Sequence, residues 1–178
     1  RSREVVLSGA AGTGKSRAIG EYLNWLCEEY PGIRVCVARK TLVSLRESWQ
    51  VTFEEKVLWP GHPALDGPSR QHRSGYDYPN GSRISLHGFD NLTRLFSTEY
   101  DVAYVQECTE LTEDEWSSLL RSIRNAKLPW QQILGDCNPD SSEHWLRKRM
   151  DRGVTTELVS RHTDNPSITE EYIRGLMD

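Results

Sequence analysis

The eight residues GAAGTGKS, at positions 9 to 16, constrain the fold of this chain more than any other stretch. They match the pattern G-x-x-x-x-G-K-S/T, in which a glycine-rich turn joins a strand to a helix and cradles phosphate groups. A short apolar run at residues 5 to 8 precedes the turn, and apolar side chains recur at helical spacing after it. The pattern therefore predicts a strand, a phosphate-binding turn and a helix, in that order.

The predicted turn offers each kind of contact that ATP with Mg²⁺ requires. Its glycines let backbone N–H groups point toward phosphate oxygens at the N-terminus of the helix. Lys15 supplies a positive charge for the β and γ phosphates, and the Ser16 hydroxyl can ligate Mg²⁺. A glycine-rich turn without a ligand is the alternative, which the strand before it and the helix after it disfavour. The predicted nucleotide-binding residues are Gly9, Ala10, Ala11, Gly12, Thr13, Gly14, Lys15, Ser16 and Arg17.

Apolar runs typical of strands alternate with helical patterns along the rest of the chain. Further strands are expected at residues 33–38, 83–87, 102–106, 132–135 and about 155–160. Further helices are expected around residues 42–53, after Thr112, at about 141–151 and from about 169. Residues 60–81 are rich in Gly, Pro, Ser and His, which favours an irregular or hairpin-like insertion. The alternation predicts a three-layer α/β fold, a mostly parallel sheet with helices on both faces.

Length, charge and cysteine content narrow the class of protein. A chain of 178 residues fits one domain, so we expect residues 1–178 to form a single P-loop domain. The net charge of −4 does not suggest a surface that binds nucleic acid everywhere, although a local basic face stays open. The four cysteines form no C-x-x-C pair, which favours buried thiols in a reducing compartment over a zinc site. Without a signal-peptide pattern or a long apolar run, an intracellular protein with no membrane partner is expected.

Two polar motifs follow predicted strands and should fall at the same sheet edge as the turn. Glu107 ends the run VAYVQE and is a candidate to activate the attacking water, with an ordinary surface role as the alternative. Gln106 stands where an acid associated with Mg²⁺ is usual, and its neutral amide can still accept from a water bound to the metal. Asp136 and Asn138, in ILGDCNP, are candidate sensors of the γ-phosphate, although an Asx-turn fits the local sequence equally well.

Basic residues outside the turn are a further group of candidates, because a P-loop site often needs an added cation in the transition state. Arg94, Arg121 and Arg124 flank the Glu107 strand, and each taken alone is more typical of a solvated surface. A basic cluster on the helix predicted at 141–151 can contact DNA phosphates but is usually a solvated face. It consists of Arg147, Lys148, Arg149 and Arg152.

Five segments spread over nearly the whole chain carry a family resemblance. They are GAAGTGKS, ARKTLVSLRESW, LHGFDNLTRLFSTEYDVAYVQECTELTEDEW, ILGDCNPDSSEHWL and RHTDNPSITEEY. Together they resemble the large terminase subunit of tailed bacteriophages, the motor that packages DNA into proheads. The P-loop is shared by a vast superfamily, whereas the E-C-T-E-L run, the N-P followed by H-W-L and the later D-N-P are the specific parts.

The resemblance implies an additional-strand P-loop fold, the ATPase domain of that subunit. It makes residues 9–16 the Walker A loop and places Gln106 and Glu107 at the end of the Walker B strand, with Glu107 as the catalytic glutamate. Ser16 and, through water, Gln106 are then expected at the metal. The family carries an acid at the Gln106 position in many members, so this chain departs from the pattern there.

The remaining site residues also take their expected roles from the resemblance. Asp136 and Asn138 fall in the coupling motif, which links loss of the γ-phosphate to movement. Arg39 resembles the arginine that follows the second strand, and Arg94 falls near the arginine finger that acts in trans. The implied catalytic set is Glu107, Arg94 and Lys15.

The implied function is ATP hydrolysis, with ATP and Mg²⁺, that drives double-stranded viral DNA into a prohead. The implied partners are double-stranded DNA, further copies of the chain in a ring, the portal protein and the small terminase subunit, in the host-cell cytoplasm during virus assembly. The full-length chain is expected to continue into a nuclease domain, so nuclease activity is not expected here. Two alternatives stay open: a P-loop kinase with residues 60–81 as a lid, and a nucleotide-gated binding module, motivated by the neutral Gln106.

Overall fold

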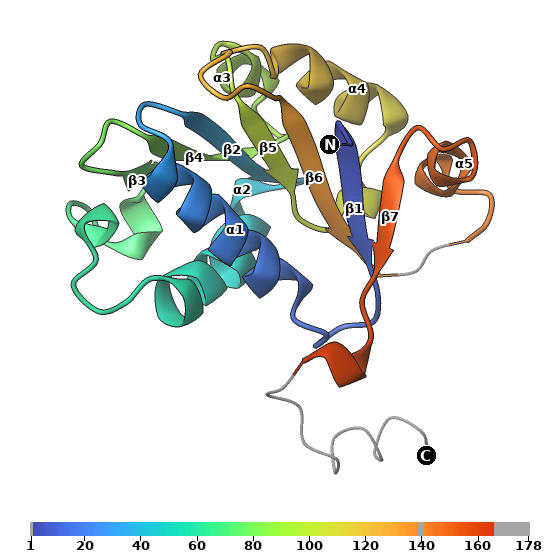
Figure 1. Cartoon of the computed structure of the whole chain (residues 1–178), viewed down its shortest axis with the longest axis horizontal. Coiled ribbons are helices and arrows are strands. Elements are labelled where there is room, and N and C mark those ends of the chain that lie inside the picture. The colour runs from blue at the N-terminus through green and yellow to red at the C-terminus, as the bar shows by residue number, and fades with distance from the viewer. Residues whose placement is uncertain (1, 139–140, 166–178) are drawn as a thin grey trace.

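A seven-stranded sheet forms the middle of the molecule, in the order β3-β4-β2-β5-β6-β1-β7 (Figure 1). This computed structural model describes residues 2–138 and 141–165. Among the described strands, all neighbours pair in parallel except β3 and β4, which are antiparallel. The strands are β1 Glu4–Ser8, β2 Arg34–Arg39, β3 Gly75–Asp77, β4 Arg83–Gly88, β5 Val102–Val105, β6 Gln132–Cys137 and β7 Thr156–Val159.

Helices cover both faces of this sheet, which confirms the predicted three-layer α/β class. Two hydrophobic cores lie on opposite faces: one takes in α1 and the helical stretch from α2, and the other takes in α3, α4 and α5. In Figure 1, α1 crosses one face of the sheet. The helices are α1 Lys15–Glu29, α2 Leu42–Leu45 with π-helical turns at Arg46–Gln50 and Phe53–Val57, α3 Leu92–Phe96, α4 Glu113–Ser122 and α5 Trp145–Asp151.

Strand β2 shows why the strand sequences are continuously apolar rather than alternating. Val35 and Val37 pack into the core on the α1 face, while Cys36 and Ala38 pack into the core on the α4 face. All four side chains are fully buried. A parallel sheet with helices on both faces has no solvated side, so both sets of alternating positions must be apolar.

The segment predicted to be hairpin-like, residues 60–81, contains 3₁₀ turns at Pro63–Leu65 and Arg70–His72 and the strand β3, which forms a hairpin with β4. It packs at the edge of the sheet farthest from β1, where the Tyr78 hydroxyl donates to Asn24 on α1 over 2.7 Å. The insertion therefore does not lie over the turn at residues 9–14, and the lid that the kinase alternative invokes has no basis in this fold.

Other predicted elements are shifted or fall outside the description. The helix expected from about residue 141 begins instead at Trp145, because the ring of His144 accepts from the Leu146 N–H over 3.2 Å and caps it. The helix expected from about residue 169 lies outside the described residues. All four cysteines are buried free thiols, as predicted. Among the described residues, no helix combines the length and apolar character that a bilayer crossing needs.

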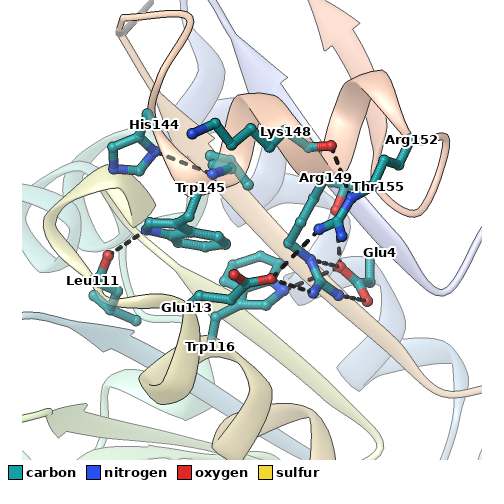
Figure 2. Close-up of polar contacts among 11 residues, drawn as sticks. Glu4, Leu111, Glu113, Trp116, His144, Trp145, Lys148, Arg149, Arg152 and Thr155 are labelled. Carbon is teal, nitrogen blue, oxygen red and sulfur yellow. Dashed lines mark hydrogen bonds and ion pairs between the residues drawn. The ribbon is translucent and has the colours of Figure 1, made fainter.

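In the basic cluster at α5, Arg149 forms a shielded ion-pair network, which corrects the sequence interpretation for this residue (Figure 2). Lys148 and Arg152 are 55% and 61% exposed and form the solvated face that the sequence predicts. The Arg149 guanidinium donates to both oxygens of Glu4 on β1, at 2.7 and 3.2 Å, and to Glu113 on α4 at 2.9 Å. The Arg149 and Glu4 side chains are 13% and 8% exposed, so the pair is largely shielded from water. The other three basic residues of the cluster also contact acids. Arg147 contacts Asp151 and Glu157, Lys148 contacts Glu143, and Arg152 contacts Glu113.

Candidate nucleotide-binding site

The strand order brings the predicted site residues to one edge of the sheet. Strand β6 lies between β1 and β5, with Ser8 opposite Cys137 and Val105 opposite Gly135. The carboxyl ends of these parallel strands therefore meet, as ligand-binding edges of α/β sheets do. A cavity at this edge is lined by the turn and by the segments that follow β5 and β6. Its lining includes Lys15, Ser16, Arg17, Glu107, Asp136 and Asn138.

The turn itself requires glycine at two positions. Gly14 has a φ of +89° and caps the N-terminus of α1, a left-handed conformation that residues with a Cβ adopt at a cost. At Gly9 a Cβ would lie 2.2 Å from the carbonyl oxygen of Ser160, which follows β7. The turn is thus packed tightly against the segment that follows β7, and the residues of the first turn of α1, whose N–H groups have no partner within the helix, line the cavity.

Lys15 is buried beside this cavity. Its Nζ donates to the carbonyl oxygens of Gly9 and Ala10 over 2.6 and 2.8 Å, and it lies 3.5 Å from Oδ1 of Asn138. The structure therefore places the positive charge of the turn within reach of the segment that follows β6. An ammonium held by neutral carbonyls keeps its full charge available to an anionic ligand.

A chain of two hydrogen bonds crosses the site from the start of α1 to the end of β5. The Ser16 hydroxyl donates to Oδ2 of Asp136 over 2.6 Å, and the backbone N–H of Glu107 donates to Oδ1 of the same carboxylate over 2.8 Å. Asp136 is 1% exposed, so these are buried interactions. Burial raises the pKa of Asp136, and the hydrogen bonds from Ser16 and Glu107 act in the opposite direction.

Glu107 has an unusual backbone conformation and a side chain with a raised pKa. Its φ of +49° and ψ of +54° are left-handed, an uncommon conformation for a residue with a Cβ and one that is often found at functional sites. Burial and the nearby charge of Asp136 raise the pKa of Glu107, while Arg39 and Lys15 act to lower it. A carboxylate with a raised pKa is a stronger base, and this one borders the cavity next to the turn.

Gln106 does not reach this cavity, although the sequence interpretation placed it near the metal. Its side-chain carbonyl lies 2.7 Å from the Ser48 hydroxyl, whose one hydrogen is shared between this oxygen and the carbonyl oxygen of Ser44 at 2.6 Å. Ser48 also accepts from Arg39 over 3.1 Å. Gln106 is buried and is not among the residues that line the cavity. Gln106 points instead toward the π-helical turn that holds Ser48.

Sequence reasoning missed three partners of the site. Ser48 holds Gln106, and Glu110 pairs with Arg39 through two hydrogen bonds of 2.8 and 3.1 Å. Asn165 donates to the carbonyl oxygen of Gly12 over 2.7 Å and so ties the segment after β7 to the turn. The D-N-P motif was a signal for Asn165, whereas a serine in a helix and a glutamate after a strand end carry no signal of their own.

The arginine candidates lie away from the turn or at its rim. Arg94 belongs to α3, and Figure 1 shows α3 at the opposite end of the sheet from the turn at 9–14. The side chain of Arg94 lies outside the described part of the structure. Arg124 pairs with Glu99 over 2.7 Å, and Arg121 donates to Ser118 over 2.8 Å, so both act within their own surface. Arg17 borders the cavity and pairs with Glu21 in an exposed i,i+4 arrangement.

The donor set at the cavity fits Mg²⁺. The Ser16 hydroxyl offers an oxygen ligand, which this hard cation prefers, and the Asp136 carboxylate beside it adds negative charge. Within the described residues, no group of three or more His, Cys, Asp or Glu side chains is arranged to hold a metal alone. This suits Mg²⁺, because that ion is commonly held by one or two protein oxygens together with water and substrate phosphates.

Comparisons with solved structures identify the fold. The large terminase of a thermophilic bacteriophage matches with a TM-score of 0.81 and 15% identity over 99% of this chain and 45% of that one. The same protein in complex with ADP matches with a TM-score of 0.73, 15% identity and coverages of 99% and 44%. The ATPase domain of the Thermus phage P74-26 large terminase, in a mutant with one arginine changed to alanine, matches with a TM-score of 0.63 and 16% identity over 90% and 76% of the two chains.

The chain thus spans less than half the length of the terminase from the thermophilic bacteriophage. No curated protein sequence matches it. At these levels of identity the structural matches show a shared fold, that of large terminase ATPase domains. A family model described as phage terminase large subunit, however, matches residues 1–176, almost the entire chain. With its P-loop, its strand order and this match over nearly its full length, the chain belongs to the phage terminase large subunit family.

Proposed function

We propose that this chain hydrolyses ATP and uses the energy to move double-stranded viral DNA into a prohead. The observation that carries the proposal is the connection from Ser16 through Asp136 to Glu107, because it joins the phosphate-binding turn to a candidate base across three strands. Membership of the terminase family supports DNA as the substrate that is moved. The single P-loop domain at residues 1–178 is then the motor part of a longer packaging protein.

The residues have distinct tasks in the proposed reaction. The N–H groups of the turn bind the phosphates, and Lys15 exchanges the carbonyls of Gly9 and Ala10 for β- and γ-phosphate oxygens. Glu107 accepts a hydrogen bond from a water and takes its proton as the water oxygen bonds to the γ-phosphorus. The bond from that phosphorus to the bridging oxygen breaks, leaving ADP and inorganic phosphate. Mg²⁺, when bound, neutralises charge on the phosphates.

A second copy of the chain completes the proposed site. Arg94 lies on α3, far from the turn of its own chain, and this placement suits an arginine that is delivered to a neighbour in a ring. Such an arginine stabilises the charge that develops on the transferring phosphate. In this proposal the ring works with the portal protein and the small terminase subunit, in the host-cell cytoplasm during virus assembly.

Asn138, next to Lys15, senses loss of the γ-phosphate.

Phosphate release from ATP should rise per chain as protein concentration rises, and it should rise further with linear double-stranded DNA. Arg94→Ala should remove the concentration-dependent part, because a neighbour then offers no cation. We expect a fall of about 10³-fold at saturating assembly, which is the lower end for an arginine finger. A malachite-green assay over a wide concentration range, with and without DNA, measures both effects.

Arg121→Ala is the matched control, since Arg121 is also an arginine near the Glu107 strand but donates to Ser118 on its own helix. It should keep the parental dependence on concentration. Turnover per chain that is independent of concentration, with Arg94→Ala equal to the parent, would contradict the shared site. Phosphotransfer to a small acceptor without a response to DNA would favour the kinase alternative. Tight ATP binding without phosphate release in any assembly state would favour the binding module.

A further inference from the structure

We infer that Asp136 on β6 supplies the acid that organises the magnesium site, in place of the position directly after β5 that Gln106 occupies. The inference rests on the proposed function, since it concerns how the same site holds Mg²⁺ with a nucleotide. It identifies Asp136 as a positioning residue that acts through Ser16 and through the backbone of Glu107. The contacts of the two candidates, Gln106 and Asp136, differ in a way that decides between them.

The side chain of Gln106 contacts residues outside the cavity. Its carbonyl oxygen accepts from Ser48, and Ser48 in turn is linked to Arg39, which pairs with Glu110. This network lies on the side of β5 that faces the π-helical turns. Moving the amide to the cavity would break its contact with Ser48, at a cost in stability. Nothing in the site offsets that cost, because the carboxylate of Asp136 is already at Ser16.

The Asp136 carboxylate fixes how the Ser16 hydroxyl points. A hydroxyl has one donor hydrogen and two acceptor lone pairs. Because the hydrogen of Ser16 goes to Oδ2 of Asp136 over 2.6 Å, its lone pairs are turned away from that carboxylate, and the hydroxyl oxygen can ligate a cation in the cavity that both residues line. The carboxylate adds a negative charge one hydrogen bond away from Ser16, the residue that would hold the metal. Outer partners of this kind orient metal ligands and raise their basicity.

The same carboxylate holds the residue that we assign as the base. Oδ1 of Asp136 accepts the backbone N–H of Glu107, which is the residue with the left-handed backbone. Since β6 is the strand between β1 and β5, a side chain at its carboxyl end can reach both neighbours at once. A side chain at the end of β5 has β6 between it and β1. The strand order therefore explains why the acid is on β6 in this chain.

The test measures how strongly Mg²⁺ tightens ADP binding, which does not depend on turnover. Titration calorimetry gives the Kd for ADP in excess Mg²⁺ and in excess EDTA for the parent, Asp136→Asn and Gln106→Met. In Asp136→Asn the factor by which Mg²⁺ tightens binding should fall by about 10-fold or more. In EDTA the same variant should bind ADP at least as tightly as the parent, because a carboxylate that repels the phosphates has been removed. Gln106→Met should keep the parental factor.

The EDTA measurement separates a role at the metal from damage to the fold. Asp136→Asn that weakens ADP binding equally in Mg²⁺ and in EDTA would overturn the inference and make Asp136 a structural residue only. A parental Mg²⁺ factor in Asp136→Asn, or loss of the factor in Gln106→Met, would also overturn it, while nucleotide binding by the parent would leave the proposed function standing. A parent that binds no ADP in either condition would overturn the proposed function and the inference together.

Discussion

Glu107→Gln should nearly abolish ATP hydrolysis and leave ATP binding close to that of the parent. Glutamine has the same shape but cannot take a proton from water, and general-base catalysis contributes typically about 10²–10⁴-fold in rate. The backbone N–H that bonds Asp136 remains in the variant, so the left-handed turn and the Ser16 contact should persist. Single-turnover phosphate release and calorimetric ATP binding, measured on the same preparation, check the two halves of this result.

Glu110→Gln is the control, because Glu110 lies three residues further along and pairs with Arg39 instead of lining the cavity. It removes a carboxylate from the same segment and should hydrolyse ATP within a few-fold of the parent, since a partly exposed ion pair contributes only about 0.2–1 kcal/mol. If Glu107→Gln hydrolyses ATP at the parental rate, then Glu107 is not the base and another group must activate the water. If both variants are equally impaired, the arrangement of the 3₁₀ turn at Cys108–Glu110 matters more than either charge.

The fold could be predicted from sequence because its signals are local. The P-loop joins β1 to α1 within a few residues, and the apolar runs that alternate with helical patterns identified six of the seven strands and the three-layer class. The turn residues were predicted for the same reason, because the glycines and Lys15 act within one short segment. The hairpin strand β3 was foreseen only as part of an insertion, since a three-residue edge strand has almost no periodicity.

Which of Gln106 and Asp136 contacts Ser16 could not be predicted, because it depends on which strand lies between β1 and β5. Sequence order places both residues at strand ends and does not say which side chain points to Ser16. That choice follows from the register of β6 against β1, where Leu7 is opposite Asp136. The contacts of Arg149 were hidden for a related reason, since Glu4 is 145 residues away along the chain.

Arg149→Met should lower the free energy of unfolding by about 3 kcal/mol, the lower end for breaking a buried ion pair by removing one partner. The lower end applies because Glu4 keeps two other donors, the indole N–H of Trp116 and the hydroxyl of Thr155 (Figure 2). Methionine replaces most of the aliphatic volume of arginine, so the loss is chiefly that of the charge partner. Urea denaturation, followed by circular dichroism with slope and midpoint fitted separately, measures the change.

Arg152→Met, directly after the same helix, is the control, because Arg152 is largely exposed and approaches Glu113 only to 3.7 Å. It should change stability by less than about 1 kcal/mol. A double variant, Glu4→Gln with Arg149→Met, tests the cause. It removes the negative charge of Glu4, which has lost its partner, but keeps a side-chain oxygen that accepts from Trp116 and Thr155. The double variant should therefore be more stable than Arg149→Met alone. Equal stability of the two would show that packing, and not the buried carboxylate of Glu4, accounts for the loss.

The helix α5 follows β6, and its Trp145 donates to the carbonyl oxygen of Leu111, four residues after Glu107. A loosened α5 should therefore also slow ATP hydrolysis while the turn still binds nucleotide.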